Sequence, residues 1–282
     1  MAPSLPTIDR EDEAKAVAAP HGGSFDPGVS ADHLPALFDY LLRLGDDSLV
    51  LGQRLTEWCG HAPALEIDLS LANIGLDLIG QATLFLNLAG EVEGKGRDGD
   101  ALAFHRDVLA FRNCLLVEQP NGDFAQTIAR QFLFSTYSQA YLDALTGSAL
   151  PAIAEIAAKA VKEVRYHAEL SADWVVRLGD GTEESRRRMI DGLDWFWRFV
   201  DEMFEDDGVE APLVAAGIAP KRGDLRSAFD ARVGEVLRQA TLSLPEYPRA
   251  VKGGRVGHHS EHLGHLLATM QFLPRTYPDA MW

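Results

Sequence analysis

Apolar residues recur along this chain at the three- and four-residue spacing of α-helices, and strand-like alternation is almost absent. The pattern predicts helices over residues 32–58, 64–89, 101–117, 123–146, 151–178, 182 to about 205, 224–242 and 260–273. The segment YPRAVKGGRVGHHS, residues 247–260, is typical of a loop. Four of the predicted helices are long, which favours an all-α fold built on an antiparallel helix bundle.

The second predicted helix, IDLSLANIGLDLIGQATLFLNLA, is apolar on most of its sides. Its polar residues Asn73, Asp77 and Gln81 recur at every fourth position. A surface helix shows an apolar stripe on a polar body, whereas this helix shows a polar stripe on an apolar body. We therefore expect the helix to be buried, with its polar stripe facing other polar groups inside the bundle.

The segment KEVRYHA, residues 162–168, has a similar character and aligns with LDLIGQA, residues 76–82. The alignment matches Asp77 with Glu163, Leu78 with Val164, and Gln81 with His167. Helical spacing directs His167 into the core with Glu163 beside it. The alignment is consistent with a bundle built from two related helix pairs.

A di-iron carboxylate site requires a Glu-x-x-His pair on each of two helices. No histidine of this chain has an acidic residue three positions before it, and the aligned pairs are Leu78/Gln81 and Val164/His167. At the usual bundle separation the first and fourth helices offer Asp46 or Asp47 and Arg130 or Gln131. We therefore predict a vestigial site without metal. Its buried polar network would comprise Asp47, Asp77, Gln81, Glu163 and His167.

A second histidine group lies in HHSEHLGH, residues 258–265. His258 and His262 are four residues apart, so that with His265 they form a possible zinc or carboxylate-binding site. The alternative, which we favour, is a helix start with partly exposed histidines and Ser260 as its cap.

The composition narrows the class of protein. Hydrophobic residues make up 46% of the 282 residues, and the net charge of −16 disfavours nucleic acid or an anionic membrane as the main partner. The two cysteines lack metal-type spacing. We found neither a signal pattern nor an uninterrupted apolar run of about 18 residues. We expect a cytoplasmic protein with a disordered tail over residues 1–30 and one helical domain over 31–282.

Several long motifs identify a resemblance that runs from about residue 41 to 282. They are LTEWCGHAP, EIDLSLANIGLDLIGQA, LLVEQPNGDFAQTIARQF, KAVKEVRYHAE, DWFWRFVDEMF and HSEHLGHLLATMQFL. These motifs closely resemble the C-subunit family of bacterial ring-1,2-phenylacetyl-CoA epoxidases. The resemblance implies a ferritin-like bundle with extra C-terminal helices. It also implies a cytoplasmic monooxygenase complex of phenylacetate catabolism, which epoxidises phenylacetyl-CoA with dioxygen and NADPH.

The resemblance further implies a division of labour among subunits. The catalytic A subunit holds the di-iron site, and a reductase with flavin and an iron–sulfur centre delivers electrons from NADPH. The C subunit pairs with A as a structural partner without a cofactor. Two alternatives remain, a stand-alone ferritin-like metal-dependent oxidoreductase and an unrelated helical binding protein. A further hypothesis places Arg112 and Asn113 in contact with the CoA end of the substrate.

Overall fold

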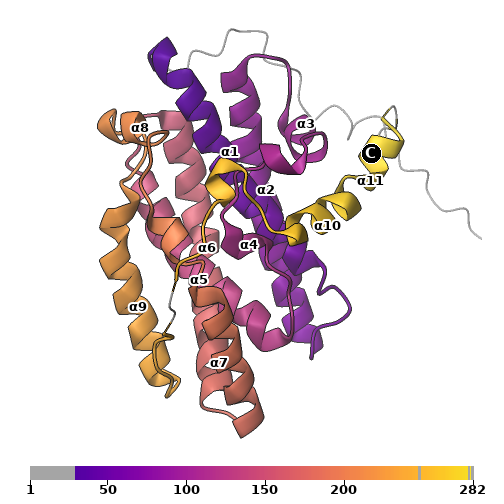
Figure 1. The fold of residues 1–282 in the computed structure, drawn as a ribbon, viewed down its shortest axis with the longest axis vertical. Coiled ribbons are helices and arrows are strands. Elements are labelled where there is room, and N and C mark those ends of the chain that lie inside the picture. The colour runs from indigo at the N-terminus through magenta and orange to yellow at the C-terminus, as the bar shows by residue number, and fades with distance from the viewer. Residues whose placement is uncertain (1–28, 247–248, 279, 281–282) are drawn as a thin grey trace, which may run out of the picture.

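The computed structural model describes residues 29–246, 249–278 and 280, which form a bundle of helices (Figure 1). The described residues contain no β-strand, so the predicted all-α fold is confirmed. The predicted disordered tail, residues 1–30, lies outside the described residues except for its last two positions.

Four long helices form the centre of the bundle: α1 (Leu34–Thr56), α2 (Leu65–Glu93), α5 (Phe124–Leu145) and α6 (Pro151–Gly179). Helix α1 packs along α2, α5 packs along α6, and the two pairs meet through α2 and α6. The core is therefore built from two helix pairs, as the internal alignment of the sequence indicates.

Shorter elements surround this centre. They are α3 (Gly99–Phe104), α4 (Leu115–Glu118), α7 (Glu183–Trp197), α8 (Ala211–Ala215), α9 (Arg226–Gln239), α10 (Glu261–Met270), α11 (Phe272–Thr276) and the 3₁₀ segments η1 (Ala31–His33), η2 (Val108–Ala110), η3 (Asp201–Phe204), η4 (Arg222–Leu225) and η5 (Gly254–Val256). Helix α7 packs on α5, and α9 packs on α5 and α6. The chain then returns across α1 to α10 and α11, which extend to the right in Figure 1.

Local capping signals account for several helix starts. Asp123 accepts a hydrogen bond from the backbone N–H of Gln126, and the Gln126 side chain accepts one from the backbone N–H of Asp123. Thr182 caps α7 through a similar box, and Pro151 occupies the first turn of α6. The predicted starts of these three helices are confirmed.

Helix α2 runs beyond its predicted end because Gly90 does not terminate it. A Cβ atom at Gly90 would lie 1.9 Å from the backbone oxygen of Arg97, so glycine there permits a close approach of the chain. The helix ends instead at Gly94, whose φ of 67° is the left-handed conformation of a C-terminal cap.

The predicted helix over residues 101–117 is wrong, since this segment forms α3, η2 and α4 with extended backbone between them. Buried carboxylates of other elements bind three of its backbone N–H groups: Arg112 binds Asp46, Cys114 binds Asp47, and Leu115 binds Glu202. These amides are thereby satisfied without a continuous helix.

Four further boundaries differ from the predictions. The helix predicted from 182 to about 205 ends at Trp197, and η3 follows it. Asp32 lies within η1 and does not cap α1, which begins at Leu34. The predicted helix over 224–242 comprises η4 and α9, and the one over 260–273 divides at Gln271 into α10 and α11. Helix α8 was not predicted.

The burial of α2 also differs from the prediction. Asn73 of the polar stripe faces outward, and Leu65, Leu69 and Leu76 are 71%, 56% and 64% exposed. Helix α2 is long and apolar enough to cross a membrane by length and composition alone, but core helices of soluble proteins meet the same criterion. Of its most apolar stretch, 44% is buried in the bundle, so α2 has one packed side and one open side.

Candidate functional site

Two hydrogen bonds connect α2 and α6 at a centre where the buried side chains of Gln81 and His167 meet the half-buried side chains of Asp77 and Glu163. His167 Nε2 lies 3.0 Å from Asp77 Oδ2, and Gln81 Nε2 donates to Glu163 Oε2 over 2.9 Å. In the internal alignment Asp77 matches Glu163, and Gln81 matches His167. Each hydrogen bond therefore joins a residue of one matched pair to a residue of the other pair, which lies one turn away on the opposite helix. The pairing is thus the one expected if a two-fold axis between α2 and α6 exchanged their matched positions, and it supports the internal alignment.

Apolar side chains occupy the remaining matched positions of this centre. Leu78 and Val164 are each 1% exposed and belong to the hydrophobic core. Neither side chain has an oxygen, nitrogen or sulfur atom to offer a metal ion. The positions that would have to be Glu in two Glu-x-x-His pairs therefore contribute only packing.

His167 is held as a neutral imidazole. Burial lowers its pKa, and the hydrogen bond and negative charge of Asp77 offset this effect only in part. In the neutral ring Nε2–H donates to Asp77, while Nδ1 is buried without a partner among the described residues.

Asp47 lies outside this pair of bonds, so the predicted five-residue network is wrong in that member. Its Oδ1 accepts from the backbone N–H of Cys114 over 2.7 Å, and its Oδ2 accepts from Arg255 over 2.7 Å. Neighbouring Asp46 pairs in the same manner with the buried side chain of Arg106. Both carboxylates of α1 thus hold other segments in place.

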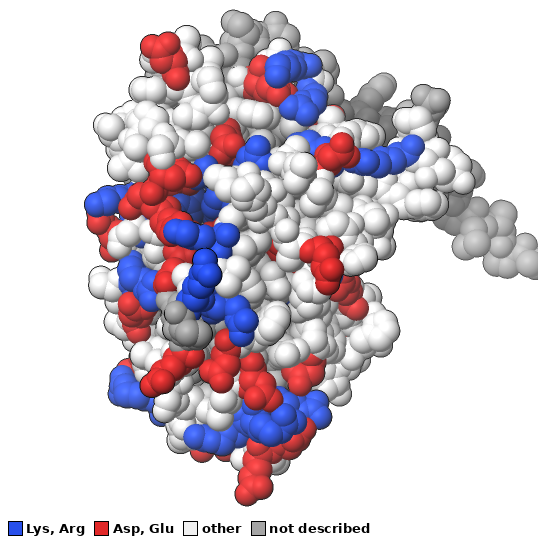
Figure 2. All heavy atoms as spheres, in the orientation of Figure 1, with Lys and Arg blue, Asp and Glu red and all other residues white. Residues whose placement is uncertain are grey.

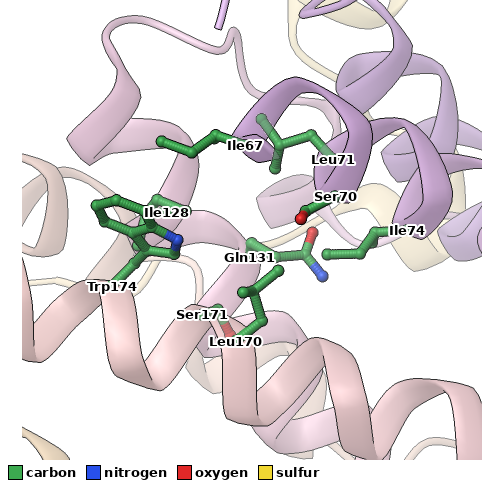
Figure 3. Close-up of a pocket in the computed structure, with 9 residues that line it drawn as sticks. All are labelled: Ile67, Ser70, Leu71, Ile74, Ile128, Gln131, Leu170, Ser171 and Trp174. Atoms are coloured by element: carbon green, nitrogen blue, oxygen red, sulfur yellow. The ribbon is translucent and has the colours of Figure 1, made fainter. Parts of the chain in front are cut away.

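Only small cavities lie beside this centre. One of about 20 Å³ is lined by Asp47, Ser48 and Gln81 among others. Another of about 10 Å³ lies between α2, α5 and α6, where Figure 3 shows the amide of Gln131 near Ser70. Each volume suits about one water molecule. Two metal ions about 3.5–4 Å apart with their ligands would need more space. Neither the side chains nor the space fit a di-iron centre.

The histidines of residues 258–265 do not converge on one point. His258 and His265 are exposed and His262 is half-buried. Within the described residues, no group of three or more His, Cys, Asp or Glu side chains is placed to hold a metal ion. Ser260 precedes α10 as predicted, but its side chain forms no capping hydrogen bond.

The buried histidine of this segment is His259, which sequence reasoning did not single out. Its Nδ1 lies 2.7 Å from Glu118 Oε2 and its Nε2 lies 3.0 Å from the backbone oxygen of Phe111. Burial would lower its pKa, but the hydrogen bond to Glu118 and the charge of that carboxylate raise the pKa above its ordinary value. No local pattern could have identified it, because its acceptors lie more than 140 residues earlier in the chain.

Arg112 and Asn113, predicted to contact CoA, have partners within the chain. Arg112 donates to Asp39 and to the backbone oxygens of Leu109 and Phe111. Asn113 is fully buried and donates to Glu118. The contact with CoA stays a prediction.

A buried charge cluster joins α1, α8 and η4. Glu210 accepts from Arg43 over 3.0 Å and from Arg222 over 2.6 Å, and Arg222 also donates to Tyr137. Burial raises the pKa of Glu210, but the charges of Arg222 and Arg43 and the hydrogen bond from Arg222 outweigh it and lower the pKa. Each charge of the cluster has an opposite charge beside it, although Arg222 Nη2 is buried without a hydrogen-bond partner among the described residues, and the ion pairs hold these elements in one geometry.

The fold defines an all-α bundle protein. Where its helices α2 and α6 face each other, the matched positions carry both polar and apolar side chains. A family model described as phenylacetic acid catabolic protein matches residues 29–282, which is nearly the whole chain. The chain therefore belongs to that family, and the resemblance found in its motifs is confirmed.

A curated relative agrees with this membership. The chain is 51% identical over 243 residues to the C subunit of the 1,2-phenylacetyl-CoA epoxidase of Escherichia coli (strain K12). The match covers 86% of this chain and 98% of that protein. These similarities associate the chain with phenylacetate catabolism and, because the relative is one subunit of a larger enzyme, imply partner subunits.

Proposed function

We propose that this chain is a non-catalytic, structural subunit of a phenylacetyl-CoA 1,2-epoxidase and stabilises a catalytic subunit that holds the di-iron site. The observation that carries the proposal is the occupation of two potential ligand positions by Leu78 and Val164. A complete Glu-x-x-His pair on both α2 and α6 would require the changes Leu78→Glu, Gln81→His and Val164→Glu.

The polar residues that remain at this centre are bonded to each other. His167 and Asp77 form one pair, and Gln81 and Glu163 form the other. Each pair links α2 to α6 and thereby rigidifies the contact between the two halves of the bundle. We assign these residues a positioning role in a ferritin-like bundle. The bundle has the helix arrangement of a metal site but lacks the ligands that would bind metal.

The open side of α2 supports docking of a partner. Its exposed positions between Glu66 and Glu91 carry no charge: Leu69, Asn73, Leu76, Gly80, Thr83 and Asn87. Between residues 67 and 90 the only charged residues are Asp68 and Asp77. This face extends over about 27 Å of helix. The face is uncharged and carries two exposed leucines, Leu69 and Leu76, which is typical of a protein interface.

Charge is unevenly distributed over the surface. In Figure 2 charged side chains are dense over α9 and sparse on the side that carries α10 and α11.

In our proposal the open face of α2 is covered by the catalytic subunit. The di-iron centre belongs to that subunit, and flavin, iron–sulfur and NADPH belong to a reductase component of the cytoplasmic complex.

Metal analysis of the purified chain tests its non-catalytic role. We expect no stoichiometric iron and no oxygen-dependent turnover of phenylacetyl-CoA by the chain alone, and turnover only when the catalytic subunit, the reductase component and NADPH are all added. About two irons per chain, or oxygen-dependent turnover by the isolated chain, would show instead a stand-alone metal-dependent oxidoreductase.

Substitution of the open face tests the docking separately. Leu69→Asp together with Leu76→Asp should abolish co-purification of the epoxidase catalytic subunit and leave the helical circular dichroism unchanged. The matched control is Leu244→Asp, since Leu244 is 51% exposed and lies outside α2. A catalytic subunit that binds the double variant as tightly as the wild-type chain would refute docking through α2.

A further inference from the structure

A groove of about 490 Å³ lies where α9 packs against α5 and α6. Val161 and Ala168 of α6 and Phe229 of α9 give its lining an apolar part. Sites for small organic molecules have volumes of roughly 300–1,000 Å³ and combine apolar lining with a few polar groups. The groove therefore has the size and the apolar surface that an organic ligand needs.

Two arginines line the groove from different helices, Arg165 from α6 and Arg232 from α9. Among the described residues, the guanidinium group of neither arginine has a hydrogen bond, an ion pair or an aromatic contact. Other arginines of the bundle are engaged, as Arg222 is with Glu210. Two unpaired guanidinium groups in one groove of an acidic protein are suited to an anionic group such as phosphate.

The spacing of the two arginines indicates an elongated ligand. A Cβ atom at Gly179 of α6 would contact Ala240, which follows α9, while Ala168 and Phe229 line the same groove. The same number of residues separates Gly179 from Ala240 as separates Ala168 from Phe229. The two helices therefore advance in the same direction, so that α6 and α9 run parallel. Arg232 then lies about 9 Å further along the helix axis than Arg165. A ligand lying along the groove can reach both guanidinium groups.

Two carboxylates restrict the chemistry further. Asp143 of α5 and Glu169 of α6 also line the groove, and their side chains too have no partner among the described residues. They repel a bare anion but accept hydrogen bonds from hydroxyl or amino groups. A ligand for this groove must therefore carry hydrogen-bond donors together with its anionic group.

We propose that this groove binds a nucleotide-type ligand. Arg165 and Arg232 hold its phosphates, Asp143 and Glu169 accept from its hydroxyl or amino groups, and the apolar lining packs against its organic part. Free nucleotides and the nucleotide portion of coenzyme A share this chemistry. The site does not depend on the structural role proposed above, because it lies at α9 and not on the open face of α2.

Calorimetric titration of the purified full chain with ADP, coenzyme A and pyrophosphate tests the proposal. We expect ADP or coenzyme A to bind with a Kd of about 0.1 mM. Tighter binding of coenzyme A than of ADP would identify a CoA compound as the source of the ligand, and the reverse order a free nucleotide. Pyrophosphate should bind at least about tenfold more weakly, because it brings no donors to the two carboxylates.

Variants connect the binding to the groove. Arg165→Met and Arg232→Met should each weaken binding about tenfold, and the double variant should abolish it. Arg187→Met is the matched control, because Arg187 is an exposed arginine on α7 outside the groove. The proposal is overturned if neither ADP nor coenzyme A binds at about 1 mM. Equal binding of pyrophosphate, or binding that survives in the double variant, overturns it as well.

Discussion

His259 offers the sharpest test of how the C-terminal segment is attached to the bundle. Both of its ring nitrogens face acceptors, the carboxylate of Glu118 at 2.7 Å and the carbonyl oxygen of Phe111 at 3.0 Å. The side chains of His259 and Glu118 are 2% and 0% exposed. An imidazole can donate from both nitrogens only when it is protonated, so the geometry requires an imidazolium.

Substitution of His259 by Ala removes one partner of a buried ion pair. Glu118 then keeps its bonds from Asn113 and from the backbone N–H of Ser260 but loses its counter-charge. Breaking a buried pair in this manner costs about 3–5 kcal/mol of unfolding free energy. His259→Gln keeps one donor, so we expect a smaller loss of about 2 kcal/mol.

The contribution of His259 also depends on pH. Because its folded-state pKa is raised above the ordinary value of 6.5, unfolding releases a proton between the two pKa values. The stabilisation is fully present below pH 6.5 and is lost as the pH rises through the folded-state pKa. Within that window stability falls by up to about 1.4 kcal/mol per pH unit.

Urea unfolding of the wild-type chain and His259→Gln at pH 6, 7, 8 and 9 measures this contribution. The difference in unfolding free energy between the two proteins should be largest at pH 6 and shrink toward pH 9. His265→Gln is the control, since His265 is exposed and should leave the pH profile unchanged. A difference between wild type and His259→Gln that is constant over this pH range would refute the assignment of an imidazolium.

Other substitutions test the packing of the chain by thermal or urea unfolding. Gly90→Ala should destabilise by more than about 3 kcal/mol, because its Cβ would lie 1.9 Å from a backbone oxygen, and an unchanged midpoint would contradict the close approach. Gly234→Ala is its matched control, with no atom within 4 Å of the new Cβ, and should stabilise α9 by about 1 kcal/mol. Thr241→Asn should stabilise by about 0.5 kcal/mol, because a β-branched residue at a φ of 58° is strained and Asn tolerates that region; a lower midpoint would argue against strain. Arg255→Met should cost about 3–5 kcal/mol because it leaves Asp47 buried without its counter-charge, and a loss below about 1 kcal/mol would show that the pair is not essential.

Features encoded by neighbouring residues could be predicted from the sequence. Asp123, Pro151 and Thr182 mark helix starts through contacts within one turn, and the structure begins helices beside all three. The polar residues that pair between α2 and α6 could also be selected from the sequence, because their spacing within each helix places them on one face. Helical spacing places Gln81 and His167 one turn from Asp77 and Glu163, and the bundle brings the two helices together.

Features that depend on distant residues could not be predicted. The segment 101–117 has helical periodicity, but carboxylates of α1 and η3 bind its amides and change its path. Periodicity also identified the unusual composition of α2 without showing which of its sides remains open. That outcome depends on which helices pack against α2, and the sequence of α2 alone does not contain this information.

The attachment of the C-terminal loop has a consequence for how the protein is made. Asp47 receives Arg255, Glu118 receives His259 and Ser260, and Glu202 accepts from the backbone N–H groups of Gly253 and Gly254. While the ribosome has produced only the first 250 residues, all three buried carboxylates lack these partners. The helices can form during synthesis, but Asp47 and Glu118 meet Arg255 and His259, and Glu202 meets its two backbone donors, only after residues 253–260 have emerged. These contacts therefore form late during translation of the described residues, and a chain truncated before residue 253 should leave three carboxylates without them and be degraded faster.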